Sequence, residues 1–233
     1  MMKRPTTIKR HKATWTNFEP ISSLLRILLG LAIYSFGVYL TIYANIGLAP
    51  WDCLAVGISR HTPLSYGGAM AAVSLAAIVI QLLLHERIGI ATVLDAVITG
   101  NLTQLFLSDS ANLWSRSIGL NISFMLVGFL FIALGMFVYM SAEMGCGPKD
   151  GLLIAIGKRL PKIPIGIVEM LLFAFITLIG WLLGGIVGIG TVISMFGAGA
   201  VMHLFSAPFT LNREHCTTGV YPKRCAGDSI IIH

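Results

Sequence analysis

The sequence contains few charged residues. Asp, Glu, Lys and Arg make up 11% of its 233 residues, and hydrophobic residues make up 56%. Soluble domains carry roughly 25% charged residues, so the composition argues against a soluble protein. Long apolar runs separate the few charges, which is typical of a polytopic membrane protein. No stretch resembles a soluble catalytic domain.

Motifs for catalysis and nucleotide binding are also missing. The chain has no Ser/His/Asp arrangement, no H-E-x-x-H and no P-loop, so we expect neither enzymatic activity nor coupling to ATP within this chain. The glycine run at 184–190 follows an apolar segment rather than a strand, so it is not a dinucleotide fingerprint. We therefore expect no cofactor. The net charge of +6 comes largely from the basic tails and does not require a nucleic-acid partner.

Cysteine is scarce as well. The four cysteines are Cys53, Cys146, Cys216 and Cys225. The last two form a C-x8-C spacing near His215, which fits no standard zinc pattern, and a cytoplasmic tail is reducing. The sequence therefore predicts plain thiols and no metal site.

A short motif occurs twice. Residues 47–52 and 145–150 both read G-x-[AG]-P-x-D, and each copy follows a long apolar run. Glycine accepts backbone angles that end a helix, and proline is favoured in a first helical turn. Each copy is therefore predicted to end one helix and start another, with Asp52 or Asp150 near the positive end of the new helix dipole. The residues that break the helices are Gly47, Pro50, Gly145, Gly147 and Pro148.

The motif belongs to a longer internal repeat. The two halves match at an offset of 98, which becomes 99 after one inserted residue, and many of the matching positions are Gly, Pro or Asp. Such agreement in register predicts a duplicated architecture. Equivalent pairs include Gly30/Gly128, Gly37/Gly135, Asp52/Asp150, Gly67/Gly166, Gly89/Gly188 and Thr92/Thr191.

Each half is expected to contain three spans and one short helix. An 11-residue helix is about 16 Å long, half of a roughly 30 Å hydrocarbon core, so the short helix must be re-entrant, interfacial or packed inside the bundle. The predicted fold is all-α, with about six transmembrane helices in two inverted three-helix repeats, each with a short re-entrant or half helix. The expected helices are 24–43, 50–60, 66–84 and 90–107, then 122–140, 148–159, 165–183 and 189–209. The expected segments are a basic tail (1–21), two repeats (22–107 and 122–209), a linker (108–121) and a short tail (210–233).

Loop charges favour cytoplasmic termini. With the N-terminus inside, 14 of the 16 Lys and Arg residues fall on the cytoplasmic side. Eight spans with parallel repeats give the same count, so the shortness of the two extra helices, rather than charge, favours six. The first apolar run lacks a cleavage site and is predicted to stay as an uncleaved span.

The chain resembles the YitT/YczE family of bacterial integral membrane proteins. Three stretches carry the resemblance, Gly-Pro-Lys-Asp-Gly-Leu at 147–152, the segment 179–185 and the segment 187–191. The resemblance covers about 22–209 and is closer to the YczE side, because no cytoplasmic domain follows the last expected span. It implies a plasma-membrane location and a multi-span fold, but it supplies no substrate.

Acidic residues in apolar segments are the candidate site. An ionisable residue inside a span costs roughly 2.5–3.5 kcal/mol on insertion scales, so each one suggests a function. Asp52 and Asp150 are equivalent in the repeat, whereas Asp95 and Glu169 break its symmetry. The expected substrate- or ion-binding residues are Asp52, Asp150, Asp95, Glu169, Asn45 and Glu143. Two alternatives remain open: Asp52 and Asp150 cap their own helices, or Asp95 and Glu169 reach interfacial water.

These features predict a permease or secondary transporter of an unidentified small solute in the bacterial inner membrane. Access to the site would alternate between the two sides. The alternative is a non-transporting accessory or regulatory subunit that docks protein partners, or a second copy of itself, through glycine-rich helix faces such as that of Gly180. An intramembrane enzyme is less favoured because no paired nucleophile and base are visible.

Overall fold

The computed structural model describes residues 19–86, 88–108, 117–142 and 144–196. Every regular element in this part of the chain is a helix, which confirms the all-α prediction there. Residues 189–196 are also helical. The rest of the expected last span, residues 1–18 of the N-terminal tail, the C-terminal tail, most of the linker and Glu143 lie outside the described residues. The helices are α1 (Glu19–Tyr43), α2 (Pro50–His61), α3 (Tyr66–Leu83), α4 (Ile90–Ser108), α5 (Ile118–Met140), α6 (Pro148–Arg159) and α7 (Ile165–Leu182).

Local sequence signals set several helix starts. Pro50 and Pro148 are the first residues of α2 and α6, as the repeated motif predicts. The Ser65 hydroxyl accepts a hydrogen bond from the Gly68 N–H at 3.3 Å and caps α3. The α1 helix begins at Glu19, ahead of the expected start at 24, so the helix extends beyond its purely apolar part.

Five described helices are long and apolar enough to cross a membrane, namely α1, α3, α4, α5 and α7. The α2 and α6 helices have 12 residues each and are too short to cross. Large apolar side chains point outward from the long helices, including Leu182 and Ile118, which are 71% and 72% exposed. Such faces suit contact with lipid.

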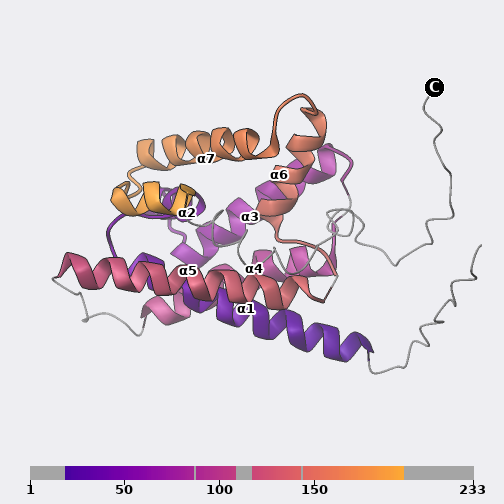
Figure 1. Ribbon diagram of the computed structural model, residues 1–233, viewed down its shortest axis with the longest axis horizontal. Helices are drawn as coiled ribbons and strands as arrows, with labels where there is room; N and C mark the ends of the chain where they lie inside the picture. Colours follow the sequence, from indigo (N-terminus) through magenta and orange to yellow (C-terminus); the bar gives the residue numbers. More distant parts are fainter. Residues whose placement is uncertain (1–18, 87, 109–116, 143, 197–233) are drawn as a thin grey trace, which may run out of the picture.

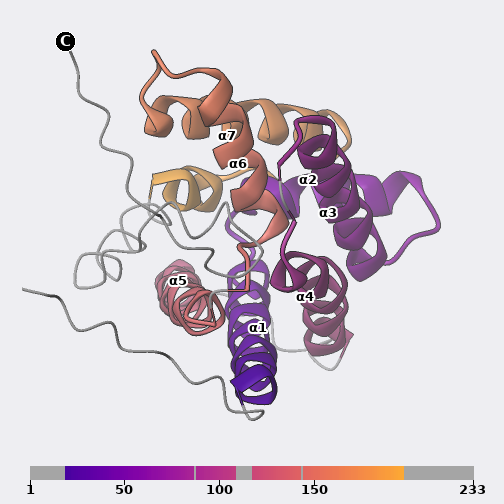
Figure 2. The ribbon, with the colours of Figure 1, turned by 90° about the vertical axis from the view of Figure 1, so that its right-hand side faces the viewer.

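The long helices form two groups in space. In Figure 2, α1 lies between α5 and α4, and the other helices lie on one side of this row. Ile27 and Leu31 of α1 pack in a shared core with Tyr139 of α5 and Ala91 of α4. In Figure 1, α1 and α5 run side by side along the lower part of the molecule.

Glycine lets α1 and α5 touch along their backbones. A Cβ on Gly30 would lie 2.9 Å from the Gly135 carbonyl oxygen, and a Cβ on Gly37 would lie 2.7 Å from that of Gly128. The order of these contacts makes the two helices antiparallel. Small residues permit this close approach of helices in a membrane.

Backbone hydrogen bonds join the two halves at equivalent positions. The Gly190 N–H donates to the Ile46 carbonyl at 2.8 Å, and the Ala91 N–H donates to the Met144 carbonyl at 3.3 Å. Ile46 matches Met144 in the repeat, and Ala91 matches Gly190. Each helix break is therefore bonded to the start of the opposite half's third expected span.

The glycines of the two motifs also pack against the opposite half of the chain. Gly47 and Gly145 have φ values of +129° and +123°, which L side chains rarely adopt. A Cβ on Gly47 would lie 2.8 Å from the Gly188 N, and one on Gly145 would lie 2.8 Å from the Gly89 Cα. Glycine is thus needed both for the turn and for the contact.

Candidate functional site

Three aspartates and one lysine gather inside the bundle. Asp52 lies in the first turn of α2, Asp95 lies on α4, and Lys149 and Asp150 lie in the first turn of α6. The Asp52 and Asp95 side chains are buried, at 4% and 8% exposure. Lys149 interacts electrostatically with all three carboxylates. We call these four residues the aspartate cluster, which joins the N-terminal ends of both short helices.

Gly147 leaves room for the carboxylates to approach one another. A Cβ at this position would lie 2.8 Å from Asp95 Oδ2 and 3.3 Å from Asp150 Oδ2. The Tyr139 hydroxyl would be 3.1 Å away from the same point. Three polar side chains from α4, α5 and α6 thus converge where a larger residue would intrude.

Tyrosines surround the cluster. The Tyr66 hydroxyl of α3 donates to Asp52 Oδ1 at 3.0 Å, and the Tyr139 hydroxyl hydrogen-bonds to Asp150. The Tyr34 ring of α1 packs edge-on against Tyr139 with ring centroids 6.4 Å apart. Phenol groups from three spans therefore line a site whose charges come from α2, α4 and α6.

Further polar contacts hold the start of α6 in place. The Gln81 side-chain amide of α3 donates to the Pro148 carbonyl at 2.7 Å, and the Thr92 hydroxyl of α4 donates to the Cys146 carbonyl at 2.5 Å. The Thr99 hydroxyl, one turn beyond Asp95 on the same face of α4, donates to the Asp95 carboxylate. The Cys146 and Pro148 carbonyls at the break before α6 are thereby hydrogen-bonded to protein, as a membrane interior requires.

The two motif aspartates lie in the first turns of α2 and α6 and contact tyrosine side chains. The N-cap residues of α2 and α6 are Ala49 and Gly147, and neither helix has a side-chain cap hydrogen bond. Asp52 and Asp150 instead accept hydrogen bonds from tyrosine hydroxyls. Their carboxylates are directed into the cluster.

The other predicted site residues lie at different distances from the cluster. Glu169 on α7 is half-buried and interacts electrostatically with Asp150, so it lies at the edge of the site. Asn45 is exposed and has φ +48° just after α1. Glu143 lies outside the described residues. The helix-breaking residues Gly47, Pro50, Gly145, Gly147 and Pro148 are at the two breaks, as expected.

Sequence reasoning overlooked several residues of the site. Lys149 lies inside the repeated motif, yet it was not among the expected site residues. Tyr34, Tyr66 and Tyr139 were not singled out either, because tyrosine is common in membrane helices. The spacing of four between Asp95 and Thr99 was the available signal for a polar helix face.

The described residues include no group of three or more His, Cys, Asp and Glu side chains close enough to hold a metal ion. Cys53 and Cys146 are buried thiols. The aspartate cluster is thus a site of mixed charge, with one ammonium among three carboxylates.

Apolar helices surrounding a buried charged cluster define a multi-pass membrane protein. Residues 21–207 match the model of a family of unknown function, DUF6198, and the chain belongs to this family. It is 30% identical to the uncharacterized membrane protein YczE of Bacillus subtilis, over 77% of this chain and 82% of YczE. The expected resemblance to YczE is therefore confirmed.

Two further relatives are uncharacterized. A Haemophilus influenzae protein is 31% identical over 86% of this chain and 90% of its own length. The Bacillus subtilis protein YyaS is 27% identical over 76% of this chain and 89% of its own length. No solved structure matches the chain.

Proposed function

We propose that the protein is a secondary transporter that moves a small solute across the bacterial inner membrane, coupled to protons or monovalent cations. The observation that carries this proposal is the aspartate cluster. In transporters built from repeats, the ends of broken helices meet near the membrane midplane and bind substrate or coupling ion. Here the N-terminal ends of α2 and α6 meet at Asp52, Asp150 and Lys149.

The charge of the cluster supports coupling to a cation. Three ionised carboxylates and one ammonium would leave two negative charges in a buried site. Each uncompensated buried ion costs several kcal/mol, so a proton or a bound cation is needed to balance the cluster. A site that takes up and releases positive charge suits a coupled transporter.

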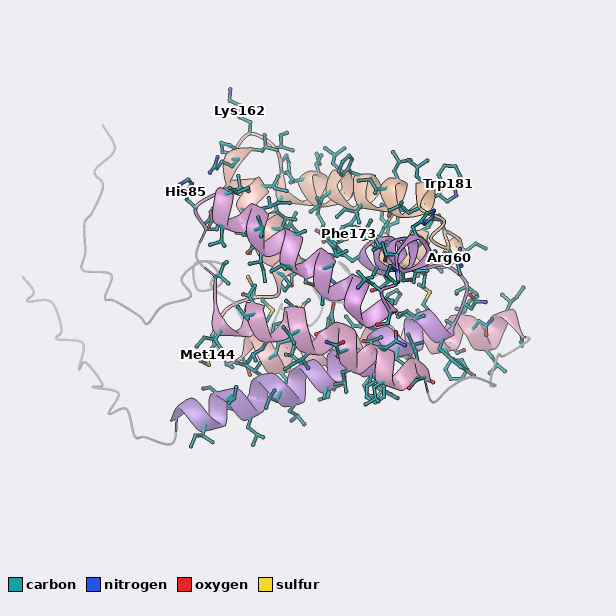
Figure 3. The ribbon with its side chains drawn as sticks, turned by 180° about the vertical axis from the view of Figure 1, so that it is seen from behind. Arg60, His85, Met144, Lys162, Phe173 and Trp181 are labelled. Carbon is teal, nitrogen blue, oxygen red and sulfur yellow. The ribbon has the colours of Figure 1, made fainter. Side chains whose placement is uncertain are left out.

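Contacts at the ends of the molecule support six spans and inverted repeats. Lys158 Nζ at the end of α6 forms an ion pair with Glu86 Oε2, just after α3, at 2.8 Å. Eight spans would put these two residues on opposite sides of the membrane, whereas six spans put both in the cytoplasm. Figure 3 agrees, with His85 and Lys162 at one end and Arg60 and Trp181 at the other.

We predict the sidedness of two exposed loop positions, His85 and Thr62. A single cysteine in place of His85 should react with a membrane-impermeant maleimide only from the cytoplasmic side. A single cysteine in place of Thr62 should react only from the outside, because α1 crosses the membrane and the short α2 helix does not cross back. Labelling of inside-out vesicles and intact cells, with the four native cysteines replaced by serine, measures both. The reversed pattern, with His85 labelled from the outside and Thr62 from the cytoplasm, would mean that the short helices cross and would contradict the inverted arrangement.

We predict that neutralising either motif aspartate abolishes transport. Asp52→Asn and Asp150→Asn keep the shape of the side chain but remove its charge, so uptake should fall at least about tenfold, the effect of about 1.4 kcal/mol. Proteoliposomes with trapped pyranine report proton movement when pulsed with sodium, potassium, amines, amino acids, sugars or organic acids. Glu19→Gln is the matched control, because it removes a carboxylate at the start of α1, outside the cluster.

Two results would count against transport. Either no solute in the panel moves protons or charge through the wild-type protein, or the asparagine variants work as well as wild type. The second result would favour the docking alternative. Gly180 is a poor test of docking, because a Cβ there would lie 2.7 Å from the Leu54 N of α2, inside the protein.

A further inference from the structure

The C-terminal end of each short helix is hydrogen-bonded to the opposite half of the chain. We call these two sets of contacts the ties. Arg60, in the last turn of α2, donates to the Gly184 carbonyl just after α7. Arg159, in the last turn of α6, donates to the Leu84 carbonyl just after α3 at 3.0 Å. Lys158, beside Arg159, adds the ion pair with Glu86.

The two ties occupy similar places in the two halves, within one residue of equivalence in the repeat. Both use a basic residue in the last turn of a short helix, where positive charge also suits the helix dipole. Both reach the backbone that follows the second span of the other half. The ties lie at opposite ends of the molecule, as the labels of Arg60 and His85 in Figure 3 show. The aspartate cluster lies between the two ties, at the N-terminal ends of α2 and α6.

We propose that these ties are latches that close the two routes to the aspartate cluster. Release of the Lys158–Glu86 and Arg159–Leu84 contacts opens the cytoplasmic route along α6. Release of the Arg60–Gly184 contact opens the outer route along α2. This inference rests on the proposed function, since it takes the cluster as the transported solute's site, but it is tested without any transport measurement.

The latches are suited to open because they are weak and reach water. The Lys158 and Glu86 side chains are 47% and 20% exposed, and exposed ion pairs contribute little to stability. Two conformations that exchange must differ little in free energy. The glycine contacts between α1 and α5, by contrast, are buried backbone contacts and form the fixed part of the molecule.

Two native cysteines report on the two routes. Cys146 and Cys53 are 5% and 0% exposed, and they lie at or just before the starts of α6 and α2. Full-length proteins that keep only Cys146 or only Cys53, with the other cysteines changed to serine, can be labelled with an impermeant maleimide. Inside-out vesicles present the cytoplasmic end, and spheroplasts present the outer end.

We expect Lys158→Gln or Glu86→Gln to raise the rate of Cys146 labelling from the cytoplasmic side about two- to five-fold, while Cys53 is unchanged. Arg60→Gln should raise Cys53 labelling from the outside only. Lys162→Gln is the matched control, because Lys162 is exposed at the same end as Lys158. Exchanging the charges in a Lys158→Glu, Glu86→Lys double variant should return the Cys146 rate toward that of the parent.

Three results would overturn the latches: Lys158→Gln labels like Lys162→Gln, both cysteines speed up together in every variant, or the charge exchange leaves the rate high. The proposed function fails separately. If the asparagine variants at Asp52 and Asp150 keep full transport while the labelling pattern holds, the latches stand and the assigned site does not.

Discussion

Replacing Gly135 by leucine should prevent the chain from folding. A Cβ at this position would lie 2.7 Å from both the Gly30 carbonyl oxygen and the Tyr34 Cα. These are backbone atoms that cannot rotate away, so α1 and α5 would have to separate. Overpacked cores lose typically 1–3 kcal/mol and occasionally more, and we expect a loss of at least about 3 kcal/mol here. Size-exclusion chromatography of a fluorescent fusion measures the folded fraction.

The same helix supplies the control for this experiment. Gly119→Leu also adds a leucine to α5, but a Cβ there meets only the Ser117 Oγ, at 3.9 Å. This variant should elute as a single folded peak. If Gly135→Leu elutes in the same way, the close packing of α1 on α5 is wrong.

The second large effect is expected at the helix breaks. Gly145→Ala must adopt φ near +123° and would place its Cβ 2.8 Å from the Gly89 Cα. Backbone strain of this kind costs of order 1–3 kcal/mol, so the Tm should fall by at least about 5 °C. Gly47→Ala, at the equivalent place in the first half, should behave alike. Thermal unfolding in detergent measures the shift.

Two substitutions serve as comparisons for the helix breaks. Gly166→Ala adds a methyl group where no atom lies within 4 Å, so it should leave the Tm nearly unchanged. Asn45 has φ +48°, a region that asparagine tolerates, and Asn45→Gly should also be close to neutral. A Gly145→Ala variant as stable as these two would show that the positive φ is not needed.

Local signals allowed the helices to be predicted from the sequence. Pro50 and Pro148 begin α2 and α6 because a proline at the first helical position leaves no hydrogen bond unmade. The end of α1 at Tyr43 follows from the glycine-containing break just after it. These features depend on residues close together in the chain, so periodicity and turn chemistry were sufficient.

Which residues belong to the site depends on how the helices pack, and this packing could not be predicted from the sequence. Asp95 and Glu169 looked alike as acids that break the repeat, yet Asp95 lies in the cluster and Glu169 at its edge. Tyr34 and Tyr139 lie on α1 and α5, and only the antiparallel contact of these helices brings their rings together. Lys149 gains its importance from carboxylates on three different helices.

The contacts that each half makes with the other also constrain when the protein can fold during its synthesis. A ribosome delivers α1 to the membrane well before α5. Until α5 is made, Gly30 and Gly37 therefore lack the α5 backbone against which they pack. The break after α1 likewise lacks its hydrogen-bonding partner at Gly190 until the end of the membrane region emerges. The first half cannot reach its final form during its own synthesis. Assembly is therefore a late event, and a nascent chain arrested midway would present unsatisfied backbone groups to quality-control proteases.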